Sequence, residues 1–428
     1  MSSKTKTTAK IEGPAPAMVP KLRFSEFQGD DPWKDMPIES IFAVRDERRV
    51  PTADIPLYSL TIENGITEKT DRYNREFLVR DAGNKKYKLV EPNDIVYNPS
   101  NLRWGAINYS QLAHAVVVSP IYEVVFLRDD SQYFLEFVAC SVMRHEQITR
   151  FITKAQGTLV ERIAVKIEDF VTTRLPVPTT RAEQQKIAEC LSSVDELMAA
   201  QARKVDALKT HKKGLMQQLF PGEGETQPRL RFPEFQNAGE WEERSLGSFI
   251  EEFRGKSTIQ DEYEVMTSAR SGLVRQRDYY DNDRITERDN IGFNVIPPNY
   301  MTYRSRSDDR QFYFNENNLG ITGIVSVYYP VFRVINGSNK FLIELLSAFS
   351  RVVGKYSVGT SQTVLSLNQL GRIRLPFPPT VKEQQRIATC LSSLDALITA
   401  ATQQLEALKT HKKGLMQQLF PSPEEVEA

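Results

Sequence analysis

The segment ALKTHKKGLMQQLFP occupies Ala207–Pro221 and recurs unchanged at Ala407–Pro421. The similarity continues upstream, where RLPVPTTRAEQQKIAECLSSVDEL at Arg174–Leu197 matches RLPFPPTVKEQQRIATCLSSLDAL at Arg374–Leu397. A repeat of this length indicates a duplicated structural unit. The chain therefore contains one long segment twice, and that segment determines the predicted architecture.

A shorter shared motif stands at the start of each repeat. LRFSEF at Leu22–Phe27 resembles LRFPEF at Leu230–Phe235, and Trp33 follows the first motif as Trp241 follows the second. The repeat thus covers most of the chain in the order variable domain, helix, variable domain, helix.

Both copies of the long segment are predicted to be helices. Thr180 and Glu183 fit the S/T-x-x-E capping box, as Thr380 and Glu383 do, each just after a proline. Apolar residues then recur at heptad spacing, interrupted by Gln201 and Lys212 in the first copy, with Ala401 filling the gap that Gln201 leaves. The seam consists of Ile187, Leu191, Val194, Met198, Val205, Leu208, Leu215 and Leu219, and of Ile387, Leu391, Leu394, Ile398, Leu405, Leu408, Leu415 and Leu419.

Each helix would be about 60 Å long at ~1.5 Å per residue. A rod of this length cannot bury its seam in one small domain, so the two helices are expected to pair as an intramolecular coiled coil. An antiparallel pairing is easiest, because a whole globular domain connects the end of the first helix to the start of the second. The fold class predicted is α+β, with two strand-rich domains joined and separated by these helices in a pseudo-two-fold repeat.

Some residues outside the seam are also unchanged between the copies. Core packing does not require this identity, which fits either a recent duplication or two copies of one partner on two equal surfaces. Lys212 and Lys412 fall on the seam. A lysine on a seam weakens helix pairing unless the helices splay apart or contact another partner. The candidate partner-binding residues are Lys209, His211, Lys212, Lys213 and Gln217, with Lys409, His411, Lys412, Lys413 and Gln417.

Composition excludes several classes of protein. The 428 residues, 40% of them hydrophobic, can bury two sizeable cores, and a net charge of +0 argues against polyanion binding by bulk charge. Three cysteines and four histidines form no metal-ligand cluster in the sequence, so no metal and no cofactor is expected. No apolar run or signal segment is long enough for a membrane, and a cytoplasmic location is expected.

The two regions that precede the helices, roughly residues 38–173 and 246–372, are predicted to be rich in β-strands. Leu60–Ile66 resembles Thr267–Leu273, and Val118–Tyr122 resembles Tyr328–Phe332, so a common skeleton is expected beneath different surfaces. The predicted strands are Ile55–Thr61, Asp94–Tyr97, Ala115–Ser119, Ile121–Leu127, Tyr300–Tyr303, Gly323–Tyr329 and Val331–Ile335.

Arginine and tyrosine alternate in loop-like parts of the second variable domain. These residue types suit contacts with base edges and phosphates. The alternative is a solvated surface balanced by acids, since Asp278, Asp308 and Asp309 stand among them. The second domain offers Arg270, Arg275, Arg277, Tyr279, Arg304, Arg306 and Arg310, and the first offers, more weakly, Arg72, Tyr73, Arg75, Lys85, Lys86, Lys88, Arg103 and Trp104.

Motifs for catalysis are missing from the sequence. It contains no glycine-rich phosphate loop and no G-x-S-x-G or H-E-x-x-H pattern. Asn98–Ser100 and Pro297–Tyr300 distantly resemble the N-P-P-aromatic motif of amino-methyltransferases, but the order or content of each is wrong. We therefore expect no catalytic residue.

Taken together, these motifs resemble the specificity subunit of type I restriction-modification systems. The resemblance covers about residues 22–421 and rests on Leu175–Pro178 with Glu183–Ile187, and on Leu375–Pro378 with Glu383–Ile387, each followed by the long helix. It implies that each variable domain is a target recognition domain reading half of a bipartite asymmetric DNA site. It further implies that the helices set the spacer and dock two adenine-methylating subunits, with restriction (motor-nuclease) subunits outside.

The resemblance and the repeat together suggest a division of the chain. Residues 1–21 and 422–428 are predicted to be tails, and residues 222–235 a linker opening the second domain. The parts are target recognition domain 1 at 22–173, helix segment 1 at 174–221, target recognition domain 2 at 222–373 and helix segment 2 at 374–421. A stand-alone DNA-modifying enzyme and a coiled-coil scaffold without DNA binding remain as alternatives.

Overall fold

The computed structural model describes residues 18–62, 64–68, 85–155, 164–270, 272–279, 289–335 and 337–421. The chain divides into two compact units, unit 1 (residues 1–199 and 406–428) and unit 2 (residues 200–405). Each unit contains one variable domain, the start of one long helix and the end of the other. The unit boundaries therefore cross the helices, whereas the predicted division separates helices from domains.

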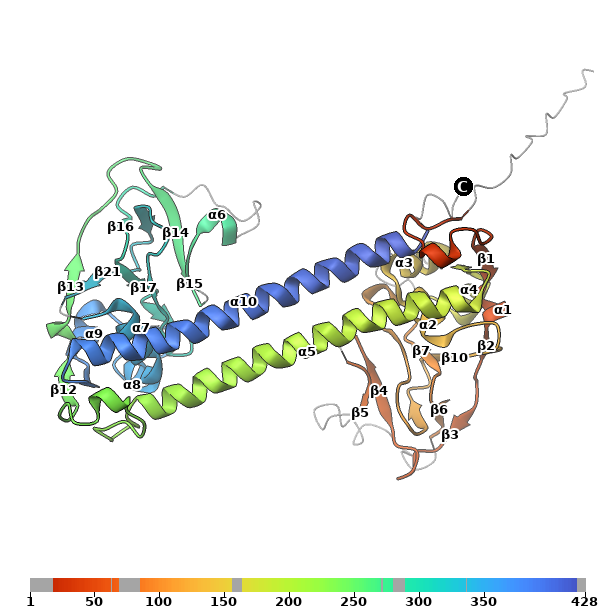
Figure 1. Ribbon diagram of the computed structural model, residues 1–428, viewed down its shortest axis with the longest axis horizontal. Coiled ribbons are helices and arrows are strands. Elements are labelled where there is room, and N and C mark those ends of the chain that lie inside the picture. Colours follow the sequence, from red (N-terminus) through yellow and green to blue (C-terminus); the bar gives the residue numbers. More distant parts are fainter. Residues whose placement is uncertain are drawn as a thin grey trace, which may run out of the picture. The chain divides into compact units, whose positions relative to one another are not determined.

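The two long helices are α5 (Arg181–Leu219) and α10 (Val381–Leu419), drawn in yellow-green and blue in Figure 1. Threonine caps both of them as expected. The amide of Glu183 donates to Thr180 Oγ1 at 3.4 Å, and the amide of Glu383 donates to Thr380 Oγ1 at 3.2 Å. Both helices stop just before a Phe-Pro pair, which cannot continue a helix.

The helices run antiparallel within each unit. In unit 1, Lys412 near the end of α10 donates to Asp195 in the first half of α5, at 2.7 Å. In unit 2, Lys212 near the end of α5 donates to Asp395 in the first half of α10, at 2.7 Å. This pairing explains the unit boundaries, because the end of each helix lies beside the start of the other.

The predicted seam is confirmed. All of its apolar residues are buried or partly buried. At the polar interruption, Gln201 Nε2 donates to the carbonyl oxygen of Ala401 at 2.9 Å, and Ala401 is only 4% exposed. The small side chain of Ala401 thus leaves room for Gln201 to reach a backbone acceptor.

Unit 1 consists of short sheets packed with helices. The pair β1-β11 joins the start of the domain to the residues before α5, and a four-stranded sheet has the order β2-β10-β7-β8. A three-stranded sheet, β3-β6-β9, and the hairpin β4-β5 complete it. The strands are β1 (Lys34–Pro37), β2 (Phe42–Val44), β3 (Arg48–Arg49), β4 (Tyr58–Thr61), β5 (Gly65–Glu68), β6 (Tyr87–Val90), β7 (Ile95–Tyr97), β8 (Ile107–Tyr109), β9 (Val116–Val118), β10 (Glu123–Leu127) and β11 (Arg174–Val177). The helices are η1 (Ser25–Phe27), α1 (Ile38–Ile41), η4 (Leu102–Trp104), α2 (Leu135–Met143), α3 (His145–Lys154) and α4 (Ile167–Thr172).

Unit 2 repeats this plan. The pair β12-β23 corresponds to β1-β11, and a sheet of order β13-β21-β17-β19 corresponds to β2-β10-β7-β8. A second sheet, β15-β14-β20-β16, and the pair β18-β22 complete it. The strands are β12 (Glu242–Ser245), β13 (Ile250–Phe253), β14 (Glu264–Ala269), β15 (Gly272–Arg275), β16 (Asn294–Ile296), β17 (Met301–Tyr303), β18 (Arg306–Ser307), β19 (Phe314–Glu316), β20 (Gly323–Val325), β21 (Val331–Val334), β22 (Thr363–Val364) and β23 (Arg374–Phe377). The helices are η6 (Pro233–Phe235), η7 (Leu246–Ser248), α6 (Gln276–Tyr279), α7 (Asn339–Ala348), α8 (Ser350–Lys355) and α9 (Leu367–Arg372).

The common skeleton is present in the turns as well as in the sheets. Asn93 before β7 and Asn299 before β17 both have positive φ, at 71° and 65°. The second predicted alignment is out of register, however. Tyr122 N donates to Ser119 O at 3.0 Å and Tyr329 N donates to Ser326 O at 2.9 Å, so Val118–Tyr122 matches the turn Val325–Tyr329 rather than Tyr328–Phe332.

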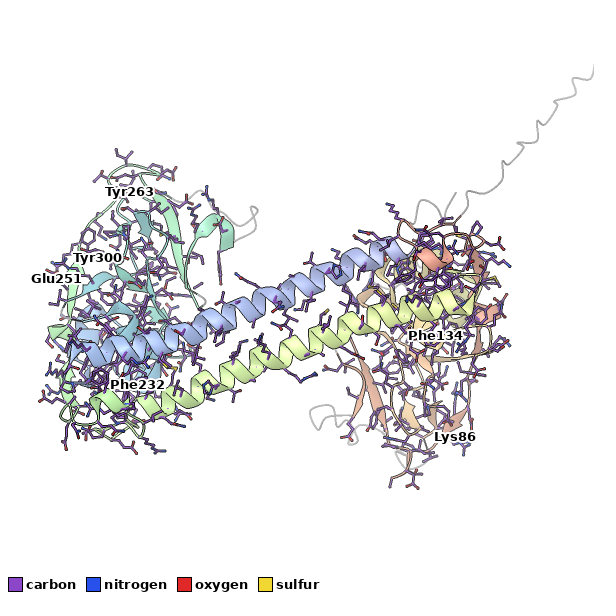
Figure 2. All side chains as sticks on the ribbon, in the orientation of Figure 1. Lys86, Phe134, Phe232, Glu251, Tyr263 and Tyr300 are labelled. Atoms are coloured by element: carbon purple, nitrogen blue, oxygen red, sulfur yellow. The ribbon has the colours of Figure 1, made fainter. Side chains whose placement is uncertain are left out.

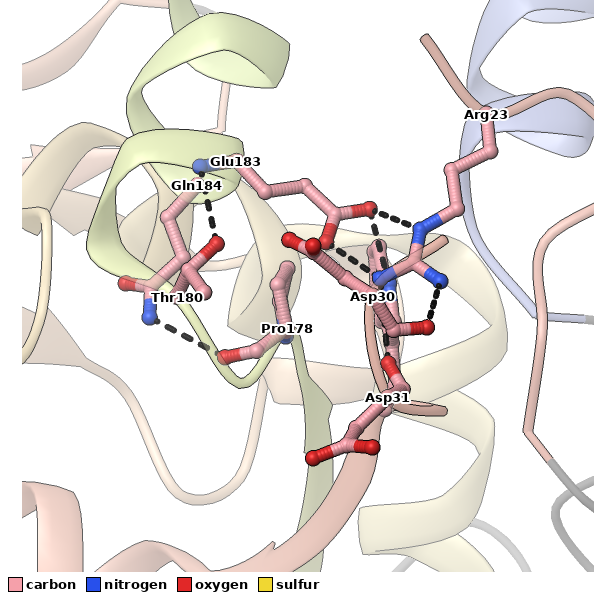
Figure 3. A network of polar contacts seen from close by, with 8 residues as sticks. Arg23, Asp30, Asp31, Pro178, Thr180, Glu183 and Gln184 are labelled. Carbon is pink, nitrogen blue, oxygen red and sulfur yellow. Dashed lines mark hydrogen bonds and ion pairs between the residues drawn. The ribbon is translucent and has the colours of Figure 1, made fainter. Parts of the chain in front are cut away.

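The shared motif at the start of each repeat binds the first turn of that repeat's long helix, and Figure 3 shows this contact between Arg23 and Glu183 in unit 1. Arg23 Nε and Nη2 donate to the carboxylate of Glu183 at 2.8 and 2.7 Å, and Trp33 Nε1 donates to it at 3.2 Å. In unit 2, Arg231 donates to Glu383 at 2.7 Å from both nitrogens, and Trp241 Nε1 donates at 3.1 Å. The expected capping-box role of the two glutamates is therefore wrong, because their side chains bind arginine and tryptophan.

The phenylalanine of the same motif packs against the same helix turn. Phe232, labelled in Figure 2, lies under the guanidinium of Arg386 with 4.4 Å from Cζ to the ring centroid. In unit 1, Lys186 Nζ lies 5.6 Å from the ring centroid of Phe24. The Arg-Phe motif thus attaches each domain to its helix through an ion pair and a cation–π contact.

The end of each long helix enters a domain core. In unit 1, Phe420 packs edge-on against Trp33 at 5.8 Å and stacks on Phe137 at 5.6 Å. In unit 2, Phe220 packs edge-on against Trp241 at 6.3 Å. The repeated Leu-Phe pair is consequently part of both cores, which accounts for its identity without a partner.

Two of the predicted boundaries need correction. The first tail was expected to reach residue 21, but Met18 O accepts from Trp33 N at 2.9 Å, and Pro20 is buried. The linker at 222–235 is partly structured, since Leu230 N donates to Gln218 O at 2.9 Å. Residues 1–17 and 422–428 lie outside the described residues. In the part of the chain that is described, no helix is long and apolar enough to cross a membrane.

Candidate nucleic-acid interface

A hollow of about 350 Å³ lies in unit 2 where the hairpin β14-β15 meets the loop after β17. Four of the predicted DNA-contacting residues line it together, although they are distant in sequence. They are Arg270, Tyr279, Arg304 and Arg306. The other lining residues are Thr267, Ser268, Ala269, Ser307, Asp308, Asp309, Gln311, Tyr313 and Tyr329. We refer to this surface as the arginine hollow.

Turns place the arginines at the ends of strands. Arg270 follows β14 directly, in a hairpin whose return requires Gly272 at φ 136°. Arg304 follows β17, and Arg306 opens β18. Residues at strand ends project from the rigid sheets as loop side chains, the usual position of binding residues.

Aromatic rings hold two of these arginines in place. The guanidinium of Arg306 lies 3.8 Å from the ring centroid of Tyr328, and that of Arg270 lies 5.3 Å from the ring centroid of Tyr313. An arginine resting on a ring keeps its planar donors oriented at low entropic cost. Both side chains can therefore present a bidentate donor pair to a ligand.

Carboxylates share the hollow with the arginines. Asp309 Oδ2 lies 3.4 Å from Arg270 Nη2, and Asp309 Oδ1 accepts from Ser307 Oγ at 2.7 Å. The hydrogen bonds from Ser307 and from the Gln311 amide lower the pKa of Asp309, with a further contribution from the charge of Arg270. The ionised carboxylate offsets part of the positive charge, so the hollow carries both positive and negative groups rather than only basic ones.

Other predicted residues of the second domain do not line the hollow. Arg275 closes β15 opposite Met266. Arg277 is in α6, where its Nε lies 3.3 Å from Glu264 Oε1. Arg310 is exposed with a positive φ of 57°, and its carbonyl oxygen would be 2.7 Å from a Cβ at Gly354. The hollow thus brings together Arg270, Tyr279, Arg304 and Arg306, whereas Arg275, Arg277 and Arg310 lie outside it.

In unit 1 the corresponding surface is only partly described. Arg72, Tyr73 and Arg75 lie outside the described residues. Arg103 and Trp104 stand in the loop between β7 and β8, the counterpart of the loop between β17 and β19. The guanidinium of Arg103 lies 5.0 Å from the ring centroid of Trp104, which is 63% exposed.

The three lysines proposed for unit 1 differ in accessibility. Lys85 and Lys86 are exposed, and Lys85 Nζ lies 5.6 Å from the ring centroid of Tyr87. Lys88 is 4% exposed and forms an ion pair with Glu123. Lys88 is therefore a structural residue, in a strand whose last three residues are all buried.

The repeated helix face separates into two groups of residues. The side chains of Lys209, His211, Lys213 and Gln217 are exposed, as are those of Lys409, His411, Lys413 and Gln417. Lys212 and Lys412 are half-buried and form ion pairs within the chain. The seam lysines thus find their counterions on the opposite helix, which the heptad pattern alone did not reveal.

A larger hollow of about 980 Å³ adjoins this face in unit 2. Lys209, Lys213, Met216 and Gln217 of α5 form one wall, and residues 347–352 around the α7–α8 junction form another. Phe349, Val352 and Ile398 give it apolar patches between basic groups. Methionine, phenylalanine and arginine are enriched at protein–protein interfaces, and Met216, Phe349 and Arg351 line this hollow.

Comparison with known proteins supports the family suggested by the repeat. Residues 238–410 match the model of the type I restriction modification DNA specificity domain. The type I restriction enzyme MjaVIII specificity subunit of Methanocaldococcus jannaschii is 26% identical over 303 residues, 63% of this chain. The chain is therefore similar to type I specificity subunits. The match spans 65% of the MjaVIII subunit, slightly less than two thirds of its length.

Other proteins show the same likeness. The putative type I restriction enzyme MjaX specificity subunit of the same organism is 22% identical over 316 residues, 69% of this chain and 70% of its own length. The crystal structure of a type I S subunit from M. genitalium covers 95% of this chain and 100% of its own, with TM-score 0.57 and 17% identity. A chain from a structure of type I complex assembly covers 91% and 98%, with TM-score 0.53 and 14% identity. The likeness to these two structures concerns the fold, which this chain shares with the M. genitalium S subunit.

Proposed function

We propose that this chain is the non-catalytic sequence-recognition subunit of a type I restriction-modification complex. Each variable domain binds one half of a bipartite asymmetric site in double-stranded DNA. The paired helices set the spacer between the halves and dock two methyltransferase subunits, and restriction subunits complete the assembly. A complex of this kind acts on DNA in the cytoplasm.

The observation that carries the proposal is the arginine hollow on a duplicated frame. Arg270 comes from the β14-β15 hairpin and Arg304 and Arg306 from the segment after β17, and rings orient two of the three. Arginine bound bidentately to guanine O6 and N7 is the commonest specific contact in the major groove. Asp309 and Gln311 add an acceptor and an amide, which extends the possible readout to cytosine and adenine.

Different half-sites follow from different loops on the same frame. The loop between β7 and β8 carries Arg103 and Trp104, whereas the loop between β17 and β19 carries Arg304, Arg306 and two aspartates. Donors and acceptors that differ at equivalent positions select different base pairs. The two domains therefore read unequal sequences, which makes the site asymmetric.

Partner docking rests on the exposed part of the repeated helix face. Four exposed residues of α5 have unchanged counterparts on α10 that are exposed as well: Lys209, His211, Lys213 and Gln217. Two equal surfaces fit two copies of one partner, here the methyltransferase subunit. The balanced net charge of +0 is compatible with this role, because partners supply further phosphate contacts.

Methylome sequencing of a host with and without this gene tests the proposal. We expect one bipartite motif, with methylated adenines in two unequal halves, that disappears when the gene is deleted and returns on complementation. A methylome that is unchanged by the deletion would contradict the recognition role.

The acidic residues of the hollow favour a second candidate, a helical scaffold that does not bind DNA. Asp308 and Asp309 would repel phosphates, and Asp309 already pairs with Arg270. Titration of the complex of this chain with its methyltransferase subunits against duplex DNA separates the two. A steep fall of affinity with salt supports DNA recognition, and the absence of any binding at low salt supports the scaffold.

A further inference from the structure

A short hairpin stands at the edge of the arginine hollow in unit 2. Strand β22 pairs with β18, with Val364 opposite Arg306 and Thr363 opposite Ser307. Val358 and Val364 exchange both backbone hydrogen bonds, at 2.9 and 2.8 Å, which closes the hairpin around residues 359–363. We call residues 358–364 the edge hairpin.

Glycine is required at the bend of the edge hairpin. Gly359 has a φ of 128°, and a Cβ there would lie 2.4 Å from the carbonyl oxygen of Gln362. A side chain at this position would therefore clash with backbone as well as strain φ. The tip has a defined shape rather than the freedom of an open loop.

The edge hairpin exposes neutral polar groups. Thr360, Ser361 and Gln362 are exposed, and Val358 is 63% exposed. The sequence carries no charged residue between Tyr356 and Leu365. Among the described residues, neither the hydroxyl of Thr360 nor that of Ser361 takes part in a hydrogen bond, so both remain available to a ligand.

Direct contacts connect the edge hairpin to the arginine hollow. Gln362 Nε2 donates to Asp308 Oδ1 at 3.4 Å, and Thr363 Oγ1 donates to the Ser307 carbonyl at 2.9 Å. Asp308 and Ser307 both line the hollow. A ligand held by Arg304 and Arg306 would therefore pass close to the hairpin tip.

We propose that the edge hairpin binds the sugar-phosphate backbone of DNA beside the bases read by the arginine hollow. This inference rests on the DNA recognition proposed above. Hydroxyl groups and exposed amides on a two-stranded ribbon suit phosphate oxygens, and contacts with the backbone fix register without carrying sequence information. Residues 358–364 contain no carboxylate, and the adjacent carboxylate of Asp308 already accepts a hydrogen bond from Gln362.

The sequence of the first repeat agrees with a contact that is independent of sequence. The dipeptide Gly-Thr of Gly359–Thr360 also occurs at residues 157–158, after the counterpart helix α3, in a segment outside the described residues. The reading loops of the two domains diverge, whereas this dipeptide is the same in both. A dipeptide that both domains share suits a contact with the sugar-phosphate backbone, which is the same at every DNA site.

The test is the double variant Thr360→Ala/Ser361→Ala in the full chain complexed with its methyltransferase subunits. Binding is measured on a duplex carrying the motif found by methylome sequencing and on an unrelated duplex of equal length. Loss of two hydroxyl contacts should weaken binding to both duplexes by about tenfold. The ratio of the two affinities and the salt slope should stay unchanged, because no charge is removed.

Two controls keep this outcome interpretable. Ser248→Ala/Ser393→Ala removes two exposed hydroxyls of the same unit that bond to their own backbone, and should leave binding unchanged. Arg306→Ala reports on the arginine hollow. Equal thermal unfolding of the double variant and the parent chain excludes a folding defect, which Gly359→Ala could produce.

The possible results separate the hairpin from the wider proposal. Unchanged binding of Thr360→Ala/Ser361→Ala together with weakened binding of Arg306→Ala would overturn the hairpin inference and leave the proposed function standing. A loss confined to one base pair of the motif would also overturn it, since the hairpin would then read a base. If the parent complex binds neither duplex, the proposed function itself fails.

Discussion

Lys412 donates to both carboxylate oxygens of Asp195, at 2.7 and 2.8 Å. Its counterpart Lys212 makes the same pair with Asp395 and also donates to Glu344 of α7 at 2.9 Å. The position of Glu344 is taken by Cys140 in α2 of unit 1, so only one unit has the third charge. The stability of unit 2 should therefore depend more on Lys212 than the stability of unit 1 depends on Lys412, although the two helix ends have the same sequence.

Replacing Lys212 should destabilise the chain more than replacing Lys412. The Lys212 side chain is 18% exposed between two carboxylates, and Lys212→Met leaves both without a counterion, at a cost of about 3 kcal/mol. Lys412→Met, with one partner and 27% exposure, should cost about 1 kcal/mol. Chemical denaturation of the two variants gives the comparison, and equal losses would contradict this assignment.

The free energy of unfolding that Lys212→Met loses relative to the wild-type chain should be smaller at acidic pH. Burial already raises the pKa of Glu344, and removal of Lys212 raises it further. In Lys212→Met the folded state then binds a proton more readily than the unfolded state, so stability recovers as pH falls through the folded-state pKa of Glu344. Denaturation of the variant at neutral pH and at mildly acidic pH should therefore show a smaller loss in acid.

The buried glutamates at the helix starts support a prediction for each unit. Glu383 is fully buried and accepts from Arg231 and Trp241, so Glu383→Ala should cost about 3–5 kcal/mol by leaving a buried guanidinium unpaired. Glu183→Ala should have the same effect in unit 1. Limited proteolysis with mass spectrometry identifies the unit that opens, and cleavage in unit 1 after Glu383→Ala would argue against this reading.

These glutamates also show what the sequence could and could not predict. The repeat predicted two capped helices, and both are present in the structure. The heptad spacing correctly predicted the buried seam. The capping box, however, describes a local contact, whereas Glu183 is bound by Arg23 and Trp33, far away in sequence. The repeated Arg and Trp were visible in the sequence, but their common target required the fold.

The arginine hollow has a similar explanation. Arg270, Arg275 and Arg277 are close together in the sequence, but only Arg270 lines the hollow, because Arg275 closes β15 and Arg277 is in α6. Arg270 is joined instead by Arg304 and Arg306, which lie beyond β17. Arg270 follows a strand of the sheet β15-β14-β20-β16, whereas Arg304 follows β17 of the sheet β13-β21-β17-β19. The sequence pattern does not indicate that the ends of these strands from two sheets meet at one hollow.

Charge reversal tests the partner surface on the helices. Native mass spectrometry of the wild-type complex should show two methyltransferase subunits per chain. Lys213→Glu and Lys413→Glu should each remove one copy, because both lysines are exposed at equivalent positions of the repeat. Binding of only one copy to the wild-type chain would refute the model of two equal surfaces.

Lengthening one helix tests its proposed role in spacing. Four residues inserted after Ala200 add about 6 Å to α5 and shift its seam by little more than one turn. Methylome sequencing of the insertion strain should give a motif with a longer spacer and the same two halves. Altered half-site sequences would mean that the helices do not act as a ruler.

The most direct test of the central claim is methylome sequencing of a strain that carries Arg306→Ala. An arginine that reads guanine contributes about 1–3 kcal/mol of discrimination, so its loss should relax one base pair. We expect this base pair to lie in a single half-site, with the half read by residues 38–173 unchanged. Equal relaxation of both halves, or a motif identical to that of the wild type, would contradict the assignment of one half-site to each domain.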